Sequence, residues 1–268
     1  MDEVGFIGAG HIGEPMVERL LAAGRRVVVY ARRQEVRDRL AACGATIVET
    51  PVELAELPVV ITCLFSDEHV LDLCTPIVRQ MKPGSVFISH TTGGPAAIRT
   101  LSESGSANGV SVVEAPFSGT PEAVRAGRLT VLLAGDDAAV EAAAEVVQAY
   151  ADSPQCTGGP GTALAAKLLN NVLFAACTQA TLSALDVAES LGIEQKTMLD
   201  VLAVSSGGST AAGYISGSGV GARIYSDRLL RYLRKDVASV RIVAGELGID
   251  IADLVAAAER GPMDVAGR

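Results

Sequence analysis

The chain has 268 residues, of which 49% are hydrophobic, and it carries a formal net charge of −9 at pH 7. This length allows two modest domains, and the hydrophobic content can fill a core, which argues against intrinsic disorder. The acidic balance argues against a nucleic-acid partner, because contact with a phosphate backbone needs a basic surface. The five cysteines lack CxxC spacing and the three histidines lack ligand spacing, so we expect reduced thiols and no metal site.

The first residues and the apolar segments predict a cytoplasmic protein without a membrane partner. The start Met1-Asp2-Glu3-Val4 lacks the basic region of a signal peptide. Gly, Pro or charged residues are expected to interrupt each apolar segment before the ~20 residues that a membrane span needs.

Short apolar runs alternate with amphipathic stretches over the first part of the chain. Continuous apolar strands that alternate with helices predict a parallel sheet covered on both faces, which is the doubly wound α/β or Rossmann architecture. The expected strands cover residues 4–7, 27–30, 59–64, 86–89, 110–114 and 129–134, and the expected helices cover 14–23 and 35–42.

The pattern changes at the turn-rich segment 158–161, after which no strand is expected. Residues 162–191 contain neither Gly nor Pro and predict one helix about 45 Å long, and further helices are expected at 195–202, 227–247 and 251–260. We therefore predict a Rossmann domain over residues 1–160 and an all-α domain over 161–268, joined by this long interdomain helix. The helical part is more apolar than a domain of ~110 residues can bury alone, which favours a homodimer or homotetramer.

A glycine-rich loop follows the first strand and leads into the first helix. It contains Gly8, Gly10 and Gly13 with His11 and Ile12 between them. Gly8 permits the tight turn, Gly10 lets the backbone approach a pyrophosphate, and Gly13 lets the helix pack closely on the strand. The N–H groups at the start of the helix would then bind the anion. The loop predicts dinucleotide binding.

The end of the second strand predicts which nicotinamide cofactor is preferred. An NAD site usually has an acid there for the ribose 2′-hydroxyl, whereas this chain has Arg32 and Arg33. Guanidinium groups suit a 2′-phosphate by charge and geometry, so NADP is favoured over NAD. A merely solvated basic helix start is the alternative, because Arg37 and Arg39 follow.

Several motifs, in order along the chain, resemble the β-hydroxyacid dehydrogenase family, which includes the 3-hydroxyisobutyrate dehydrogenases and is 6-phosphogluconate dehydrogenase-like. The resemblance spans residue 4 to about residue 260. The motifs are GFIGAGHIGEPM at 5–16, EAPFSGT at 114–120 with GRLT at 127–130, a glycine-rich turn followed by KLLNN at 158–171, and Lys235-Asp236.

The resemblance implies a fold and a reaction. Substrate is expected between the two domains, and hydride passes between the nicotinamide and a small β-hydroxy acid or its semialdehyde. Lys167 would be the general acid/base, which suits a reaction whose alkoxide needs a proton. The family's pattern assigns substrate binding to Ser118, Gly119, Thr120, Asn171 and Lys235. It assigns cofactor binding to Leu64, Phe65, Thr92 and Lys235, besides the glycine loop and the two arginines.

Departures from the family's pattern leave the substrate open. Ser89 replaces an acid, Thr120 replaces a glycine, and Phe65 stands where a proline is usual. We expect a substrate other than plain 3-hydroxyisobutyrate. His90 is interpreted as a loop position, and the Gly- and Ser-rich segment 205–221 as a mobile wall of the active site.

Two alternatives to the dehydrogenase remain. One is an imine reductase, and the other is a catalytically silent nucleotide-binding protein of the same fold. Lys167 argues against the first, because imine reductases generally have an acid or an aromatic residue at that position. Lys167 together with Asn171, one helical turn later, argues against the second.

Overall fold

The computed structural model describes residues 2–267, which form two compact units. The first unit ends at Lys167 and the second begins at Leu168. The division therefore falls inside the long helix α7 (Thr162–Ser190), whereas the boundary predicted from the sequence precedes that helix.

The first unit is built on one sheet with the strand order β3-β2-β1-β4-β5-β6-β8-β7, and β9 pairs with β8. All pairings from β3 through β6 are parallel, whereas β8 runs antiparallel to β6 and β7. The six predicted strands are confirmed, and the short β3, β7 and β9 are additional. The bounds are β1 Glu3–Ile7, β2 Arg26–Tyr30, β3 Thr46–Ile47, β4 Val59–Thr62, β5 Val86–Ser89, β6 Ser111–Glu114, β7 Phe117–Ser118, β8 Thr130–Ala134 and β9 Gln155–Gly158.

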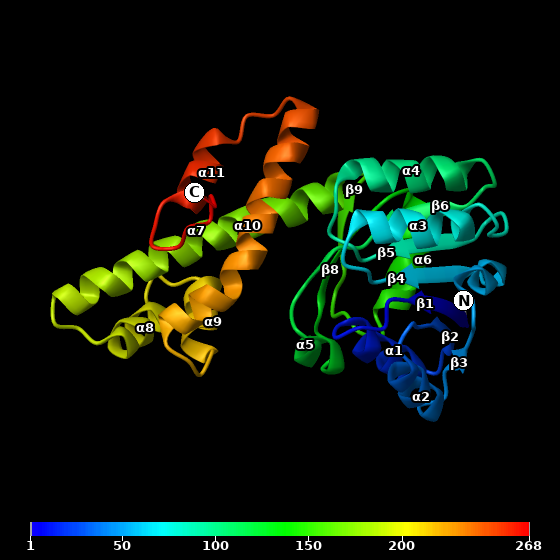
Figure 1. Cartoon of the computed structure of the whole chain (residues 1–268), viewed down its shortest axis with the longest axis horizontal. Helices are drawn as coiled ribbons and strands as arrows, with labels where there is room; N and C mark the ends of the chain where they lie inside the picture. The colour runs from blue at the N-terminus through cyan, green and yellow to red at the C-terminus, as the bar shows by residue number, and fades with distance from the viewer. Residues whose placement is uncertain (1, 268) are drawn as a thin grey trace. The chain divides into compact units, whose positions relative to one another are not determined.

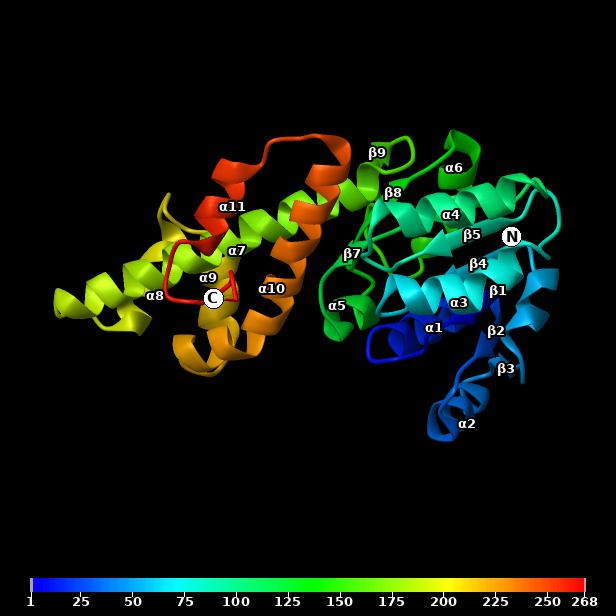
Figure 2. The ribbon, with the colours of Figure 1, turned by 45° about the horizontal axis from the view of Figure 1, so that its top comes forward.

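Helices cover both faces of this sheet (Figure 2), as the continuous apolar strands predicted. One core lies between the sheet and α1, α2 and α6, and the other lies between the sheet and α3, α4 and the 3₁₀ helix η1. Neighbouring residues of one strand enter opposite cores, since Phe6 belongs to the first and Ile7 to the second. The bounds are α1 Gly13–Ala22, α2 Gln34–Ala42, η1 Pro51–Glu56, α3 Asp67–Val78, α4 Pro95–Ser106, α5 Pro121–Arg125 and α6 Asp137–Val147.

The second unit is helical throughout its described residues, and α7 forms its axis (Figure 1). Apolar side chains of α7, α10 and α11 form a third core, which includes Val172, Val237 and Val255. The α/β fold followed by a helical region is thus confirmed. One helix, α9, was not expected, because its segment is rich in Gly and Ser. The bounds are α8 Gln195–Val204, α9 Thr210–Gly217, α10 Ala222–Leu247 and α11 Ala252–Glu259.

By length and composition, α7 could cross a membrane, and it is the one such helix among residues 2–267. The expectation that every apolar segment is interrupted too early is therefore wrong for α7. A single helix of this kind is weak evidence, because the core helix of a soluble protein passes the same test, and 44% of its most apolar window is buried. The absence of a membrane partner stays a prediction.

Candidate cofactor and substrate site

A cavity of about 330 Å³ lies at the carboxyl ends of β1, β2 and β4. The sheet order reverses between β1 and β4, and ligands of open α/β sheets bind in the crevice at such a switch point. Six residues predicted to bind the cofactor line this cavity: Gly8, Gly10, Arg32, Arg33, Leu64 and Phe65. Folding thus brings these residues together at one cavity, although Gly8 and Phe65 are 57 residues apart in the sequence.

The three loop glycines differ in whether the surrounding protein leaves space for a side chain. Gly8 has φ +93°, and a Cβ there would lie 2.3 Å from the carbonyl oxygen of Cys63. A Cβ on Gly13 would lie 2.2 Å from the carbonyl oxygen of Gly8. A Cβ on Gly10, in contrast, would meet no atom within 4 Å. Packing of the protein therefore requires Gly8 and Gly13, whereas Gly10 leaves room for a ligand to approach the backbone.

The start of α1 is open to an anion. Ile12, the residue before the helix, provides no side-chain cap, and the Glu14 N–H donates to the Gly10 carbonyl at 2.9 Å, so no side chain blocks the start of the helix. His11 is exposed in the loop, and the loop is closed by the bond from the Gly10 N–H to the Gly8 carbonyl at 2.8 Å. These features fit a pyrophosphate at a helix N-terminus.

Arg32 and Arg33 lie at the rim of the cavity. Both are exposed, and both belong to the turn between β2 and α2. Arg33 precedes α2 without capping it, so that helix also begins without a side-chain acceptor. Two guanidinium groups beside open helix N–H groups form a favourable environment for a phosphate.

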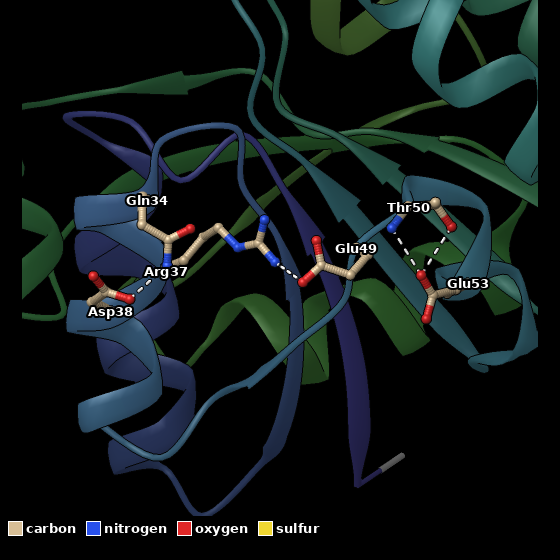
Figure 3. Close-up of polar contacts among 6 residues, drawn as sticks. All are labelled: Gln34, Arg37, Asp38, Glu49, Thr50 and Glu53. Atoms are coloured by element: carbon tan, nitrogen blue, oxygen red, sulfur yellow. Dashed lines mark hydrogen bonds and ion pairs between the residues drawn. The ribbon is translucent and has the colours of Figure 1, made fainter.

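The other two arginines of this segment have protein partners. Arg37 donates to Glu49 (Figure 3), and the Arg39 Nε donates to the Glu14 carboxylate at 2.6 Å. The hydrogen bond from Arg39 lowers the pKa of Glu14. The basic helix start thus consists of two arginines in ion pairs and two that face the cavity.

Two neighbouring loops at the ends of β4 and β5 are tied together. The Thr91 hydroxyl donates to the Leu64 carbonyl at 2.9 Å, and the Asp67 carboxylate accepts from the Gly94 N–H at 2.7 Å. Thr92 is half-buried and lies in the sequence between Thr91 and Gly94, the two residues of the second loop that form these bonds. The predicted cofactor residues Leu64 and Thr92 therefore lie in two loops that these hydrogen bonds hold together.

His90 lies in the loop directly after β5, as interpreted from the sequence, but its side chain is buried and held by two hydrogen bonds. The imidazole is 1% exposed, with Nδ1 at 2.5 Å from the Ala115 carbonyl and Nε2 at 2.8 Å from the Tyr150 hydroxyl. Because a carbonyl only accepts, Nδ1 carries the proton and Nε2 accepts from Tyr150. Burial lowers the pKa of His90 to about 4. The neutral ring packs edge-on against Phe117 and so joins the β5 loop to the predicted substrate loop.

The predicted substrate loop begins in β7. Ser118 is half-buried, and Gly119 has φ +141°, a conformation that a side chain would strain. The Thr120 hydroxyl accepts from the Ala123 N–H at 3.4 Å and so caps α5. The threonine that replaces the family's glycine thus supports the turn with its own hydroxyl.

The predicted catalytic lysine lies near the start of α7. Lys167 is 9% exposed, so most of its side chain is out of solvent. In the second unit, Asn171 donates to the Asp236 carboxylate at 3.0 Å, and Lys235 is exposed. Asp236 was not among the predicted site residues, although it belongs to the Lys235-Asp236 motif that the resemblance used.

Glu114, at the end of β6, is a second residue that the site prediction missed. It is 1% exposed, and its carboxylate accepts from the backbone N–H groups of Gly161 and Leu164 at the start of α7. Next to it in register lies Ser89, whose hydroxyl is buried without a hydrogen-bond partner among the described residues.

Two family matches cover nearly the whole chain. Residues 3–159 match the NAD binding domain of 6-phosphogluconate dehydrogenase, and residues 161–260 match the NAD-binding family of NADP-dependent 3-hydroxyisobutyrate dehydrogenase. The chain belongs to the β-hydroxyacid dehydrogenase family. This result confirms the family that the motifs indicated, and it makes the first unit an NAD(P)-binding domain.

Curated relatives are about a third identical to this chain over the residues that match. A probable mitochondrial 3-hydroxyisobutyrate dehydrogenase of Arabidopsis thaliana is 34% identical over 221 residues, which are 76% of this chain and 63% of that protein. An NAD-dependent L-serine dehydrogenase of Pseudomonas aeruginosa is 30% identical over 215 residues, 79% of this chain and 72% of that protein. The chain thus spans a little under two thirds of the plant relative.

Solved structures of the β-hydroxyacid dehydrogenase fold agree with this architecture. The 3-hydroxyisobutyrate dehydrogenase of Mycobacterium tuberculosis with L-serine has a TM-score of 0.85 at 24% identity, over 97% of this chain and 92% of that one. An imine reductase of Streptomyces aurantiacus has a TM-score of 0.68 at 18% identity, over 96% and 92%. At these identities the likeness shows the fold alone.

Proposed function

We propose that this protein is an NADP-preferring oxidoreductase that transfers a hydride between the nicotinamide and a small β-hydroxy acid or its semialdehyde. The observation that carries the proposal is the cavity at the strand switch point, with its glycine loop and its two arginines, in a chain of the β-hydroxyacid dehydrogenase family. NADP is preferred over NAD because Arg32 and Arg33 face this cavity, where an NAD site would have an acid.

Lys167 is the proposed general acid/base. When bound, the cofactor supplies or accepts the hydride at the substrate carbon. Lys167 takes the hydroxyl proton during oxidation and returns it to the alkoxide oxygen during reduction. The low exposure of this residue, 9%, supports the role, because charged groups stabilise developing negative charge more strongly in a site that excludes water.

The proposed substrate contacts follow the family's motifs. Ser118 and Gly119 bind the carboxylate, Asn171 orients the substrate or Lys167, and Lys235 contributes a positive charge. The relatives named for 3-hydroxyisobutyrate and L-serine act on acids with a hydroxyl on the β-carbon, and this class is proposed here. Thr120 in place of a glycine favours a substrate other than plain 3-hydroxyisobutyrate.

A homodimer or homotetramer is also proposed. Large apolar side chains of the second unit are exposed, among them Leu173 at 53%, Val204 at 87% and Ile242 at 63%. Large apolar side chains left exposed in this number favour burial in a contact between subunits. Light scattering of the purified protein measures the assembly directly, and a monomer at micromolar concentration would contradict it.

The test is an NADP(H)-coupled screen of small hydroxy acids, including L-serine and 3-hydroxyisobutyrate, with a cyclic imine as the alternative substrate. Lys167→Ala is expected to lower turnover by a few orders of magnitude and to leave NADPH binding unchanged. Lys196→Ala is the matched control, because Lys196 is exposed and paired with Asp200 on α8. Reduction of the imine alone, or full turnover by Lys167→Ala, would contradict the proposal.

A further inference from the structure

Glu114 has an unusual environment for a carboxylate. It lies at the end of β6, is 1% exposed, and forms no ion pair within residues 2–267. Its hydrogen bonds come from backbone amides alone, from Gly161, from Ala163 and, at 3.1 Å, from Leu164. A buried charge is costly unless such donors compensate it, so the position of Glu114 calls for a specific cause.

The donors of these bonds are the free N–H groups of one helix end. Helix α7 begins at Thr162, and its first turn has no intrahelical acceptors. The Thr162 hydroxyl is directed to the Gly159 carbonyl at 2.8 Å, so it does not provide the cap. A carboxylate from the sheet provides it instead, and its charge complements the positive end of the helix dipole.

The same bonds determine where the next turn of α7 lies. Leu164 and Lys167 are three residues apart on one helix, so they share a face and are separated by less than one turn. The other end of the connection is rigid, because Glu114 pairs in register with Ser89 of β5 on one side and with Ala134 of β8 on the other. A displacement of the first turn would therefore move Lys167 relative to the strand ends that hold the cofactor cavity.

We propose that Glu114 is a positioning residue, which fixes the first turn of α7 on the sheet and thereby holds Lys167 in place for proton transfer. The kinetic part of this inference rests on the proposed function of Lys167. The structural part, an anchor between β6 and α7, stands on the contacts alone.

Glu114→Gln is the decisive variant, because it keeps the size of the side chain and directs an N–H₂ group at backbone donors. Glu114→Asp keeps the charge and both acceptor oxygens and is the conservative variant. Glu53→Gln is the matched control: its carboxylate also accepts from a backbone N–H, that of Thr50 at 2.8 Å, at η1 (Figure 3), which contributes nothing to the cofactor cavity.

Two measurements are made on the whole chain of 268 residues. Hydrogen exchange reports the protection of amides 161–167, which Glu114→Gln is expected to lower about tenfold. Steady-state kinetics is expected to show kcat lowered roughly ten- to hundredfold, because an error of about 1 Å in a catalytic group has effects of this size. The Kd of NADPH is expected to change less than about twofold, since the glycine loop is untouched. Glu114→Asp is expected to retain more turnover than Glu114→Gln.

A double-mutant cycle with Lys167→Ala separates positioning from general destabilisation. If Glu114 acts through Lys167, Glu114→Gln lowers turnover less than about twofold once Lys167 has been removed. Equal losses in both backgrounds would overturn the proposal, as would unchanged exchange at 161–167. If the unaltered enzyme oxidises no hydroxy acid, the proposed function fails, and hydrogen exchange alone decides whether Glu114 anchors α7.

Discussion

The hydroxyl of Tyr150 donates to Nε2 of His90 at 2.8 Å, and both side chains are buried to 1% exposure or less. The opposite ring nitrogen donates to Ala115, so both nitrogens of a neutral imidazole are satisfied. The ring therefore connects the loop after β5 with the loop after β6. Protonation would convert Nε2 into a donor that faces the Tyr150 hydroxyl in a buried site.

This arrangement predicts acid-sensitive stability. The folded protein holds the pKa of His90 at about 4, below its ordinary value of 6.5, so the unfolded chain binds a proton first as the pH falls. The stabilisation is fully present above pH 6.5 and is lost between pH 6.5 and about 4, and it amounts to about 3 kcal/mol. Urea unfolding at several pH values measures the free energy of unfolding across this interval.

The variant His90→Gln cannot titrate, so its free energy of unfolding is expected to depend less on pH over the same interval. His69→Gln is the matched control, because His69 is exposed on α3 and should keep the acid sensitivity of the unaltered protein. An unchanged pH dependence in His90→Gln would show that other groups cause the loss of stability.

In the glycine loop, a change of Gly to Ala is expected to weaken NADPH binding at position 10 and to lower stability at position 13. Gly10→Ala adds a methyl group that meets no protein atom within 4 Å, so the free energy of unfolding is expected to change by less than about 1 kcal/mol. The methyl group would occupy the approach of the pyrophosphate and raise the Kd of NADPH at least about tenfold. Gly13→Ala forces a contact of 2.2 Å with the Gly8 carbonyl and should lower stability by roughly 1–3 kcal/mol. Fluorescence titration and thermal unfolding give both quantities, and normal NADPH affinity in Gly10→Ala would rule out this binding position.

The arginines of the β2–α2 turn predict cofactor selectivity. Arg32→Ala removes a guanidinium group at the cavity rim, and the KM for NADPH is expected to rise roughly tenfold or more, as for a lost charged hydrogen bond. The KM for NADH should remain nearly unchanged. Arg37→Ala is the control, because Arg37 pairs with Glu49. Equal effects of Arg32→Ala on both cofactors would contradict recognition of a 2′-phosphate.

Much of the first unit could be predicted from local patterns. Its central strands are continuous apolar runs, and the loop from Gly8 to Gly13 stands between a strand and a helix, so periodicity and glycine spacing suffice. The strands β7 and β9 lack such a pattern: one has two residues, and the other, Gln155–Gly158, is polar and largely exposed. They form because β8 offers a partner, which no local window contains.

The missed site residues depend on contacts between distant parts of the chain. His90 meets Ala115 and Tyr150, which lie 25 and 60 residues away, and Glu114 meets Leu164, 50 residues away. A single histidine or glutamate has the same local signature in a loop, in a core and at a helix cap. Helix α9 was missed for a related reason, because burial of apolar side chains such as Ile215 offsets the poor helix propensity of its glycines.

The second unit contains one polar contact whose removal should be costly. Gln179 on α7 is fully buried, its Nε2 donates to the Met263 carbonyl at 2.7 Å, and its Oε1 accepts from the Met263 N–H at 2.9 Å. Gln179→Leu leaves both backbone groups without partners, at a cost of about 1–3 kcal/mol each. Gln148→Leu makes the same change at an exposed position of the first unit and should be nearly neutral. Chemical unfolding and hydrogen exchange at the Met263 amide measure the effect; unchanged protection there would show that α11 and the segment after it are held to α7 by apolar packing alone.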